Sequence, residues 1–345
     1  MAKANIQIAT DMQAVNDFVV NSWRPEQWSE DGRPYDRHGN PLVVNERALQ
    51  TNSFLAREEW EALDRVVYEM GQRQLGAYQD LIGHGLTRRS SIATMSSKWR
   101  VASERIAADV TMDFRSRLTY DRTDKKMYGV PLPLISAPYS IGRRELAATR
   151  AAGQDVETFE AEEATRAVTE KAEDILINGN TSIVVDGNSI PGYTTLTSRD
   201  TDTAANYGGG DFGTEGNGRK TVLGMMEALA AKQYYGPFGI YLNNVQYHEL
   251  LNRYTDGSGD TELSAIETIP EIEFVKPNAL VAAANCIMVQ FSRSVVDLEI
   301  AMTLENRRWE SPDGAEMFFL VMMAVAPRLK TDYDGNAGIA HATAC

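Results

Sequence analysis

The chain has 345 residues, of which 43% are apolar and 24% charged, and its formal net charge is −14. This composition is ordinary for a folded globular protein, and the length suits roughly two compact domains, or one large domain with extensions. The negative charge disfavours a protein that grips DNA or a membrane surface, because binding to phosphate backbones depends on Lys and Arg displacing counterions. Weak contact with nucleic acid remains compatible with it.

Redox and targeting features predict a cytoplasmic protein. The two cysteines, Cys286 and Cys345, form neither a disulfide framework nor a metal-binding spacing, which favours a reducing compartment. The first fifteen residues carry acidic and polar side chains where a signal peptide needs an apolar core. The longest apolar run, residues 317–326, is too short to span a bilayer and indicates a buried strand, so no membrane partner is expected.

Residues 1–54 do not have the pattern of a folded domain. Prolines and a run of turn-forming residues interrupt them. Trp23 and Trp28 lie within this stretch, and large aromatic side chains are costly to leave in water. We therefore expect an extended arm that docks on its own body or on a neighbouring subunit.

A helix is predicted over residues 55–82, followed by two glycines that end it. Apolar residues recur along it at steps of three and four and therefore share one face. These residues are Trp60, Leu63, Val67 and Met70.

Residues 86–130 change character. Apolar and polar side chains alternate over residues 110–120, which is the periodicity of a strand. From Lys98 to Lys126 there are eight basic residues and five acidic ones, in a chain that is otherwise acidic. We expect a long polar two-stranded hairpin, which has little core of its own and needs something to lie against. The prolines that follow favour extended backbone and indicate a hinge out of the hairpin rather than a polyproline ligand; they are Pro131, Pro133 and Pro138.

A second helix is predicted over residues 156–177. Its buried face is marked by Ala161, Ala164, Val168 and Ile175. Seven acidic residues and two basic ones indicate that its other side is solvated or faces an interface. On that side Glu162, Arg166 and Glu170 form an i, i+4 ladder.

The Gly-rich segment 206–218 is the best internal boundary. Beyond it we expect a helix over residues 219–235 with Val222, Met226 and Leu229 inward. A strand over residues 239–244 and a short helix over 245–254 come next. The remaining strands are predicted over residues 272–275, 286–291, 296–300 and 317–326. Helices and strands alternate without a regular βαβ period, so the predicted class is α+β.

The sequence offers little chemistry, and we predict no catalytic, cofactor-binding or metal-binding residues. The histidines His38, His84, His248 and His341 lack ligand spacing, and HExxH, CxxC and GxSxG arrangements do not occur. Asp256 with Asp260, and Asp332 with Asp334, do not have the spacing of a calcium loop and indicate exposed turns. The carboxylates of the second helix are sufficient in number for acid–base work, but solvation and ion pairing is the commoner role.

The motif GTEGNGRKT, residues 213–221, comes closest to a phosphate-binding loop. Such a loop needs Gly, four residues, Gly, then Lys and Ser or Thr directly. Here Arg219 intrudes, Lys220 comes one position late, and no apolar strand precedes the motif. We interpret it as a flexible linker into a helix.

Several segments, in order, resemble the major capsid proteins of tailed phages and the encapsulin shells that share their fold. LAREEWEALDRVVYEMGQRQLGAYQDLIG resembles the opening helix of an encapsulin subunit. IGRRELAATRAAGQDVETFEAEEATRAVTEKAEDILINGNTSI, followed by IPGYTTL, is similar to the long spine helix and its Gly-anchored turn. GPFGIYLNNVQYHELL resembles the strand and helix of the axial domain, and DLEIAMTLENRRW with EMFFLVMMAVAPRLKT the closing strands of the peripheral domain. The resemblance covers about residues 55–330.

The resemblance implies a division of the chain. It consists of an N-terminal arm (1–54), an opening helix (55–85), an extended loop (86–133), the first part of a peripheral domain with the spine helix (134–205), an axial domain (206–289), and closing strands of the peripheral domain with the C-terminus (290–345). The 54-residue leader favours a phage capsid over an encapsulin, whose opening helix sits close to the chain start. The leader is also shorter than the scaffolding segment that some capsid proteins carry, so a separate scaffold is expected.

The resemblance also implies subunit contacts and partners. The expected contacts are made by Trp23 and Trp28 of the arm and by Arg100, Arg105, Arg115, Arg117 and Arg122 of the extended loop, where arginine forks can pair with carboxylates of a neighbour. Expected partners are copies of the same chain in hexamers and pentamers, a scaffold, a portal, decoration proteins and weakly held DNA. Covalent crosslinking through Lys98, Lys125 or Lys126 has no identifiable partner here.

The leading hypothesis is a non-enzymatic major capsid protein that self-assembles into the icosahedral shell around a tailed-phage genome. It would be made and assembled in the bacterial host cytoplasm and located in the virion. One alternative is an encapsulin-like compartment that holds cargo proteins. Another, from a different class, is a soluble enzyme with a composite carboxylate site.

Overall fold

The computed structural model describes residues 27–28, 34–35, 63–67, 76–102, 125–144, 159–254, 260–311 and 316–345. The chain divides into two units, Met1–Trp60 and Glu61–Cys345. In the first unit, strands β1 (Gln27–Trp28) and β2 (Pro34–Tyr35) pair antiparallel. All other described elements belong to the second unit.

The described part of the second unit is a mixture of helices and strands, and its class is α+β as predicted. A helical segment at residues 63–67 precedes the named helices. Those are α5 (Gly76–Gly83), α7 (Phe159–Ile177), α8 (Asn217–Ala231), α9 (Asn244–Glu249) and α10 (Glu262–Glu267). Among the described residues no helix is both long and apolar enough to pass through a lipid bilayer.

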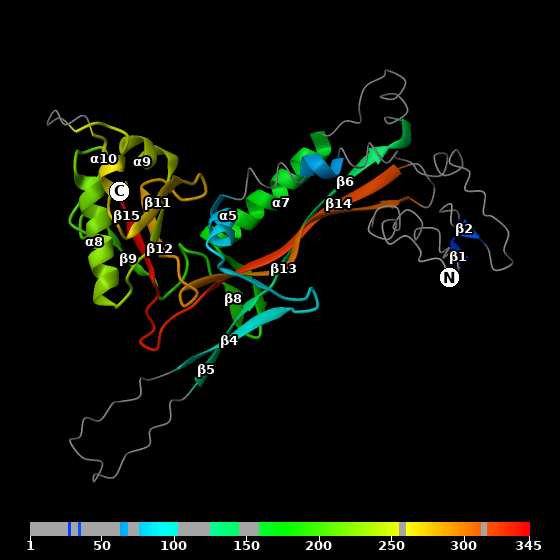
Figure 1. The fold of residues 1–345 in the computed structure, drawn as a ribbon, viewed down its shortest axis with the longest axis horizontal. Helices are drawn as coiled ribbons and strands as arrows, with labels where there is room; N and C mark the ends of the chain where they lie inside the picture. The colour runs from blue at the N-terminus through cyan, green and yellow to red at the C-terminus, as the bar shows by residue number, and fades with distance from the viewer. Residues whose placement is uncertain are drawn as a thin grey trace, which may run out of the picture. The chain divides into compact units, whose positions relative to one another are not determined.

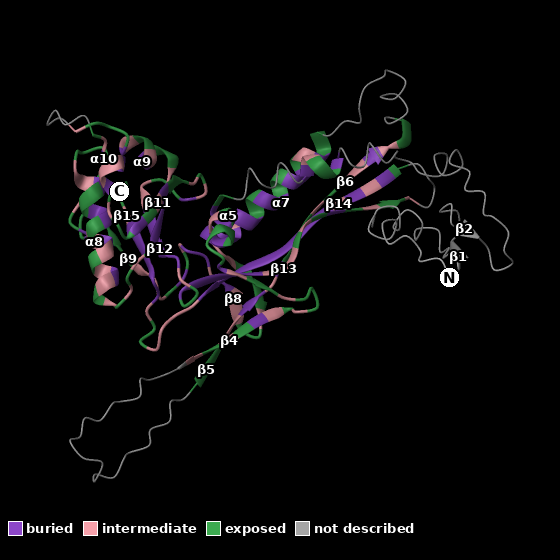
Figure 2. Cartoon of the chain, viewed as in Figure 1, coloured by how far each residue is buried: buried purple, intermediate pink, exposed green. Residues whose placement is uncertain are grey.

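A four-stranded sheet forms the long body on which α7 lies. Its order is β3 (Thr87–Arg89), β13 (Val296–Glu310), β14 (Glu316–Leu329), β6 (Leu134–Gly142). Strands β13 and β14 are antiparallel along their length, and α7 packs against β14 and β6, beside which it runs in Figure 1. Figure 2 shows the buried side of α7 turned toward these strands. Pro138 sits in β6, an edge strand, where a missing backbone N–H is tolerated.

A second sheet of five strands forms a separate layer with α8, α9 and α10. Its order is β11 (Ile272–Pro277), β10 (Phe238–Leu242), β12 (Asn285–Gln290), β15 (Ile339–Thr343), β9 (Asp200–Thr203). Strand β10 is buried at every position, and its apolar side chains share a core with those of α8. Strands from three distant parts of the sequence therefore meet in one sheet.

Two small hairpins complete the described fold. Strands β4 (Ser96–Ala102) and β5 (Lys125–Pro131) pair antiparallel in unbroken register from Ser96↔Pro131 to Ala102↔Lys125. Strands β7 (Asn180–Val185) and β8 (Asn188–Ile190) form the other and contact β5. The predicted two-stranded hairpin is thus confirmed at the end where it joins the body, while residues 103–124 lie outside the described residues.

The long periodic segments were predicted correctly. Helix α7 has Ala161, Ala164, Val168 and Ile175 buried, as their spacing indicated. The predicted Arg166–Glu170 pair is present at 2.7 Å. Leu63 and Val67 of the opening helix are buried, and α5 ends at Gly83. Trp60 and Met70 lie outside the described residues, as do residues 110–120.

Several boundaries were wrong, for local physical reasons. Helix α8 covers 217–231 rather than 219–235. Met225 is its fully buried methionine, whereas Met226, predicted inward, is only partly buried. Strand β10 ends at Leu242 because the next residue, Asn243, is the N-cap of α9 and accepts a hydrogen bond from Val245 N–H. Helix α9 in turn stops at Glu249. The strand predicted over 296–300 extends to Glu310, because β14 supplies a partner for its polar half.

The Gly-rich segment 206–218, predicted as an internal boundary, is packed into the body. Tyr207 and Phe212 within it are buried in the core of the five-stranded sheet. A Cβ on Gly209 would lie 2.1 Å from Thr221 Oγ1 and 2.3 Å from Asn217 O, so glycine here allows close packing on α8. The flexible linker predicted over 213–221 was wrong in its last part, because residues 217–221 begin α8 itself.

The turn after α7 depends on two glycines that lie against each other. Gly179 has φ +74°, and a Cβ at Gly192 would lie 2.2 Å from Gly179 N. Thr195 Oγ1 accepts from Gly192 N–H at 2.9 Å, and Thr194 Oγ1 donates to Ile177 O at 3.0 Å. The end of the helix and the segment after β8 are therefore joined backbone to backbone.

Gly192→Ala should lower the free energy of unfolding by about 3 kcal/mol or more, because the atoms that a Cβ would meet are backbone and cannot move aside. Gly83→Ala is the matched control, since a Cβ there meets nothing within 4 Å. It should change stability by less than about 0.5 kcal/mol. Chemical denaturation of both variants makes the comparison, and equal stabilities would contradict the close approach.

Candidate functional site

The histidines have separate structural surroundings in the described part of the chain. His84 lies between Phe274 and Phe291, with ring centroids 6.2 and 4.9 Å away, and pairs with Glu273 at 3.4 Å. His341 is buried in β15 and accepts a hydrogen bond from Arg199 Nε at 3.3 Å. Burial, and then the nearby Arg199 charge, lower the pKa of His341 to about 4, so it is neutral at physiological pH.

Clusters with metal-binding character are not found among the described residues. No group of three or more His, Cys, Asp or Glu side chains there could hold a metal ion. Cys286 and Cys345 are free and buried. Asp332 accepts a hydrogen bond from Asn336 N–H at 2.8 Å, which is the turn that the sequence indicated. His38 and Asp256 lie outside the described residues.

The motif that resembled a phosphate-binding loop already has an anion at its helix. Glu262, almost fully buried on α10, accepts from Arg219 N–H at 2.7 Å and from Gly216 N–H at 3.2 Å. Backbone N–H groups at a helix N-terminus attract anions because the helix leaves them unpaired. Here a carboxylate of the same chain occupies that position at the start of α8.

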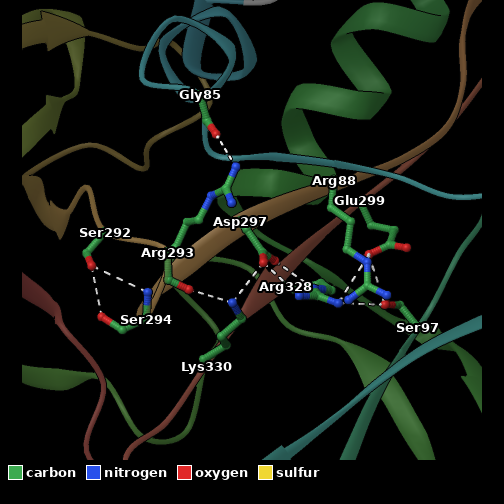
Figure 3. Close-up of polar contacts among 10 residues, drawn as sticks. All are labelled: Gly85, Arg88, Ser97, Ser292, Arg293, Ser294, Asp297, Glu299, Arg328 and Lys330. Carbon is green, nitrogen blue, oxygen red and sulfur yellow. Dashed lines mark hydrogen bonds and ion pairs between the residues drawn. The ribbon is translucent and has the colours of Figure 1, made fainter.

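The most elaborate polar site lies where the β4–β5 hairpin meets the four-stranded sheet. Asp297 and Arg328 face each other across β13 and β14 and are both almost fully buried. Two hydrogen bonds join them, from Arg328 Nε at 2.6 Å and from Nη2 at 2.7 Å. Lys330 approaches the same carboxylate at 2.7 Å (Figure 3). We call these three residues, together with Ser97, Glu299 and Arg88 described next, the root cluster.

Arg328 also reaches the hairpin. Its Nη1 donates to Ser97 Oγ on β4 at 3.0 Å and lies 3.2 Å from Glu299 Oε2. Ser97 Oγ in turn donates to Glu299 at 3.0 Å, and Arg88 of β3 lies 3.6 Å from the same carboxylate. The guanidinium sits 5.5 Å from the ring centroid of Trp99. Four strands thus converge on one buried arginine, as Figure 3 shows for the polar groups.

Hydrogen bonds within the root cluster favour the ionised form of Asp297. Burial by itself would raise the pKa of Asp297, but hydrogen bonds from Arg328 and Lys330 outweigh it and leave that pKa below its ordinary value. A buried charge is tolerated only where it is paired and hydrogen bonded. The cluster therefore fixes the start of the hairpin to the sheet.

Several large apolar side chains are exposed on the hairpin strands and the segments next to them. Met95, Met127 and Leu134 are 78%, 54% and 55% exposed, and Ile92 is 58% exposed. Lys98 on the other face of β4 pairs with Asp186 of the β7–β8 turn at 2.6 Å. Large apolar side chains that stay exposed together mark a contact surface more often than a solvated one.

The structure places only some of the predicted contact residues. Arg100 is exposed on β4, opposite Met127 of β5. Trp28 lies in β1 of the first unit, paired with Pro34. The others, which are Trp23, Arg105, Arg115, Arg117 and Arg122, lie outside the described residues. The described residues therefore do not test whether the predicted contact residues lie close to one another.

Sequence reasoning missed the root cluster. A signal for it was present, since Asp297 and Glu299 are two apart within an apolar strand, and Arg328 and Lys330 are two apart at the end of another. Residues two apart point to the same face of a strand. The match between the two pairs becomes visible only when the register Asp297↔Arg328 is known.

Arg328→Met should lower the free energy of unfolding by about 3–5 kcal/mol, because it leaves two buried carboxylates without their shared cation. Arg307→Met is the control, since Arg307 pairs with Glu305 at 3.2 Å on the exposed part of β13. That change should cost less than about 1 kcal/mol. Urea denaturation measures both losses, and a loss at position 328 no larger than at 307 would contradict a structural role for the cluster.

Comparison with known proteins identifies a matching family model and structures of similar fold. A family model described as "Family of unknown function (DUF6260)" matches residues 48–342. No curated protein matches the sequence. The structure is similar to a virus-like particle from Pyrococcus furiosus, with a TM-score of 0.55 and 15% identity, over 83% of this chain and 98% of that one.

Two further similar structures are capsids. The capsid of Myoviridae phage XM1 has a TM-score of 0.55 and 14% identity, over 77% of this chain and 91% of that one. The capsid of an empty GTA particle has a TM-score of 0.55 and 15% identity, over 75% and 88%. Similarity at such low identity is evidence of a common fold. The predicted resemblance is thereby confirmed at that level, and the chain has the fold of tailed-phage capsid subunits and of this virus-like particle.

Proposed function

This chain belongs to DUF6260, a family of unknown function, and from its fold we propose that it is the shell-forming subunit of an icosahedral particle, the major capsid protein of a tailed phage. The observation that carries the proposal is the capsid fold over most of the chain. In the proposed role the protein acts through many modest interfaces between identical subunits, without catalysis.

The hairpin root supports a role in assembly. The buried root cluster fixes the hairpin to the body, yet Met95, Met127 and Leu134 beside it remain exposed. A two-stranded hairpin is marginally stable by itself and gains from a surface to lie against. We propose that a neighbouring subunit provides that surface, with Arg100, Arg105, Arg115, Arg117 and Arg122 among the contacts.

The sheets suggest how the proposed domains divide. The axial domain expected at 206–289 would consist of the five-stranded sheet with α8, α9 and α10, and would therefore also include β9 and β15. The peripheral domain, expected at 134–205 and 290–345, would retain α7 and the four-stranded sheet but lose those two strands. The opening helix (55–85) and the arm (1–54) would keep their expected limits, whereas β3 of the extended loop (86–133) would join the four-stranded sheet of the peripheral domain.

The proposed partners follow from the proposed role. Copies of the chain would form hexamers and pentamers, aided by a scaffold and a portal and joined by decoration proteins. The net charge of −14 suits a container that holds DNA weakly. The particle would assemble in the bacterial cytoplasm and the subunit would be found in the virion. An encapsulin-like cargo shell is the second candidate, favoured by the 98% coverage of the Pyrococcus furiosus particle chain.

The first test is the size of the assembly. The full chain, expressed alone and with candidate scaffold proteins encoded beside it, should give closed particles or rings of subunits by light scattering and negative-stain microscopy. A chain without residues 1–54 should fold with the same circular dichroism but assemble less or into aberrant forms, because the arm supplies contacts rather than core. Normal shells from the truncated chain would contradict the role of the arm, and a monomer or dimer under every condition would contradict the shell proposal.

A second test addresses the extended loop. Reversing charge at Arg115 together with Arg117 should reduce assembly severalfold, because cations that pair with a neighbour's carboxylates become repulsive. The circular dichroism spectrum and the urea midpoint should stay unchanged. If the midpoint falls instead, the two arginines stabilise their own subunit and their proposed role at the interface is wrong.

A further inference from the structure

One buried carboxylate joins three separate parts of the second unit. Glu173 on α7 is only 4% exposed. Its Oε1 accepts hydrogen bonds from Ala77 N–H at the start of α5, at 2.8 Å, and from Asn278 Nδ2 just after β11, at 3.0 Å. The spine helix is thereby connected to α5 and to the edge of the five-stranded sheet. We call this meeting point the joint.

A second set of contacts closes the joint from the other side. Asp80 on α5 accepts a hydrogen bond from Tyr241 Oη of β10 at 3.0 Å and forms an ion pair with Lys276 of β11. The Tyr241 ring stacks on that of Tyr193, with centroids 6.3 Å apart. Helix α5 is therefore held between α7 and the five-stranded sheet by polar side chains from both.

Three buried oxygens at the joint have no hydrogen-bond partner among the described residues. They are Glu173 Oε2, Tyr78 Oη and Tyr193 Oη. Tyr78 and Tyr193 are fully buried, and burial, then the charge of Glu173, raises the pKa of each phenol. Buried polar atoms are nearly always paired, so an ionised Glu173 would carry its charge on an oxygen that no donor compensates.

A proton on Glu173 would remove this uncompensated charge. An ionised carboxylate only accepts hydrogen bonds, and Oε2 receives none from the described residues, whereas a neutral carboxyl group has no charge to compensate. Burial raises the pKa of Glu173 to about 7, outweighing hydrogen bonds from the Ala77 and Tyr78 backbone and from Asn278, and the charge of Asp80 acts in the same direction as burial. The cation nearest in this set, Lys276, is already engaged by Asp80.

We propose that Glu173 is a proton-controlled lock on the joint between α7, α5 and the five-stranded sheet. In the neutral form no uncompensated charge is buried at the joint, and the three parts stay tightly docked. On ionisation the proton leaves to solvent, a buried charge remains beside Asp80, and the joint loosens. The lock lies within one chain and does not depend on shell assembly.

The direction of the pH effect follows from linkage. The pKa of Glu173 in the folded chain, about 7, lies above its ordinary value of 4.5, so the folded state holds a proton that the unfolded state releases. The stabilisation from this group is fully present below the ordinary value and is lost as pH rises through about 7. The joint is therefore tighter in mildly acidic solution than in mildly basic solution.

The test compares thermal unfolding of the full chain with that of Glu173→Gln, between about pH 6 and pH 8. The wild-type Tm should fall over this interval by about 2–4 °C, while Glu173→Gln, which stays neutral and keeps an acceptor, should show little of this slope. Glu170→Gln, on the exposed side of the same helix, is the matched control and should keep the wild-type slope. A wild-type Tm that is constant over the interval, or a Glu173→Gln chain with the wild-type slope, would overturn the lock.

Asn278→Ala gives an independent test if Glu173→Gln does not fold. The Asn278 hydrogen bond favours the ionised carboxylate, so its loss should move the midpoint of the Tm decline to higher pH. Hydrogen exchange of the Ala77 amide, corrected for its intrinsic pH dependence, should show the same displacement. A midpoint that stays in place or moves to lower pH contradicts the assignment to Glu173.

Discussion

The pairing of Arg328 with Asp297 across β13 and β14 is the interaction on which the rest of the described fold depends. It sits where the two longest strands, β3 and the hairpin root come together. Moving two charges out of water is costly, so only the observed arrangement, with each oxygen matched to a donor, is tolerated. A slip of one residue in either strand would turn one partner to the other face of the sheet. The pair thus specifies the register between β13 and β14 and also contributes a contact between them.

Two further acidic residues show that this chain uses carboxyl groups inside as well as on its surface. Glu173 caps the start of α5, and Glu262 caps the start of α8. In each case the capping residue comes from a different helix, so the unpaired backbone N–H groups at the start of one helix are satisfied by a side chain of another. The same arrangement explains why a Gly-rich helix entrance that resembles a phosphate loop has no place for phosphate: a side chain of the protein already satisfies its N–H groups.

Prediction from the sequence succeeded where the residue pattern within one element is enough to define it. The spacing of Ala161, Ala164 and Val168 defines a buried helix face without reference to any neighbour, and that face is buried. It failed where the signal lies in a partner. Strands β7, β9 and β15 are short or polar and become strands only through pairing. The root cluster likewise depends on cross-strand register, and the joint on helix contacts distant in sequence. Of the predicted contact residues, the described structure places Arg100 and Trp28 alone.

The position of β15 constrains the order in which the chain can fold during synthesis. It lies between β12 and β9, and β9 pairs with no other described strand. An emerging chain therefore makes β9 and then the whole of α8, β10, β12 and the β13–β14 ribbon before the strand that completes the sheet appears. Pairing between segments so far apart is slow to form and leaves strand edges open in the meantime. Those temporarily open edges would be where faulty association between nascent chains begins.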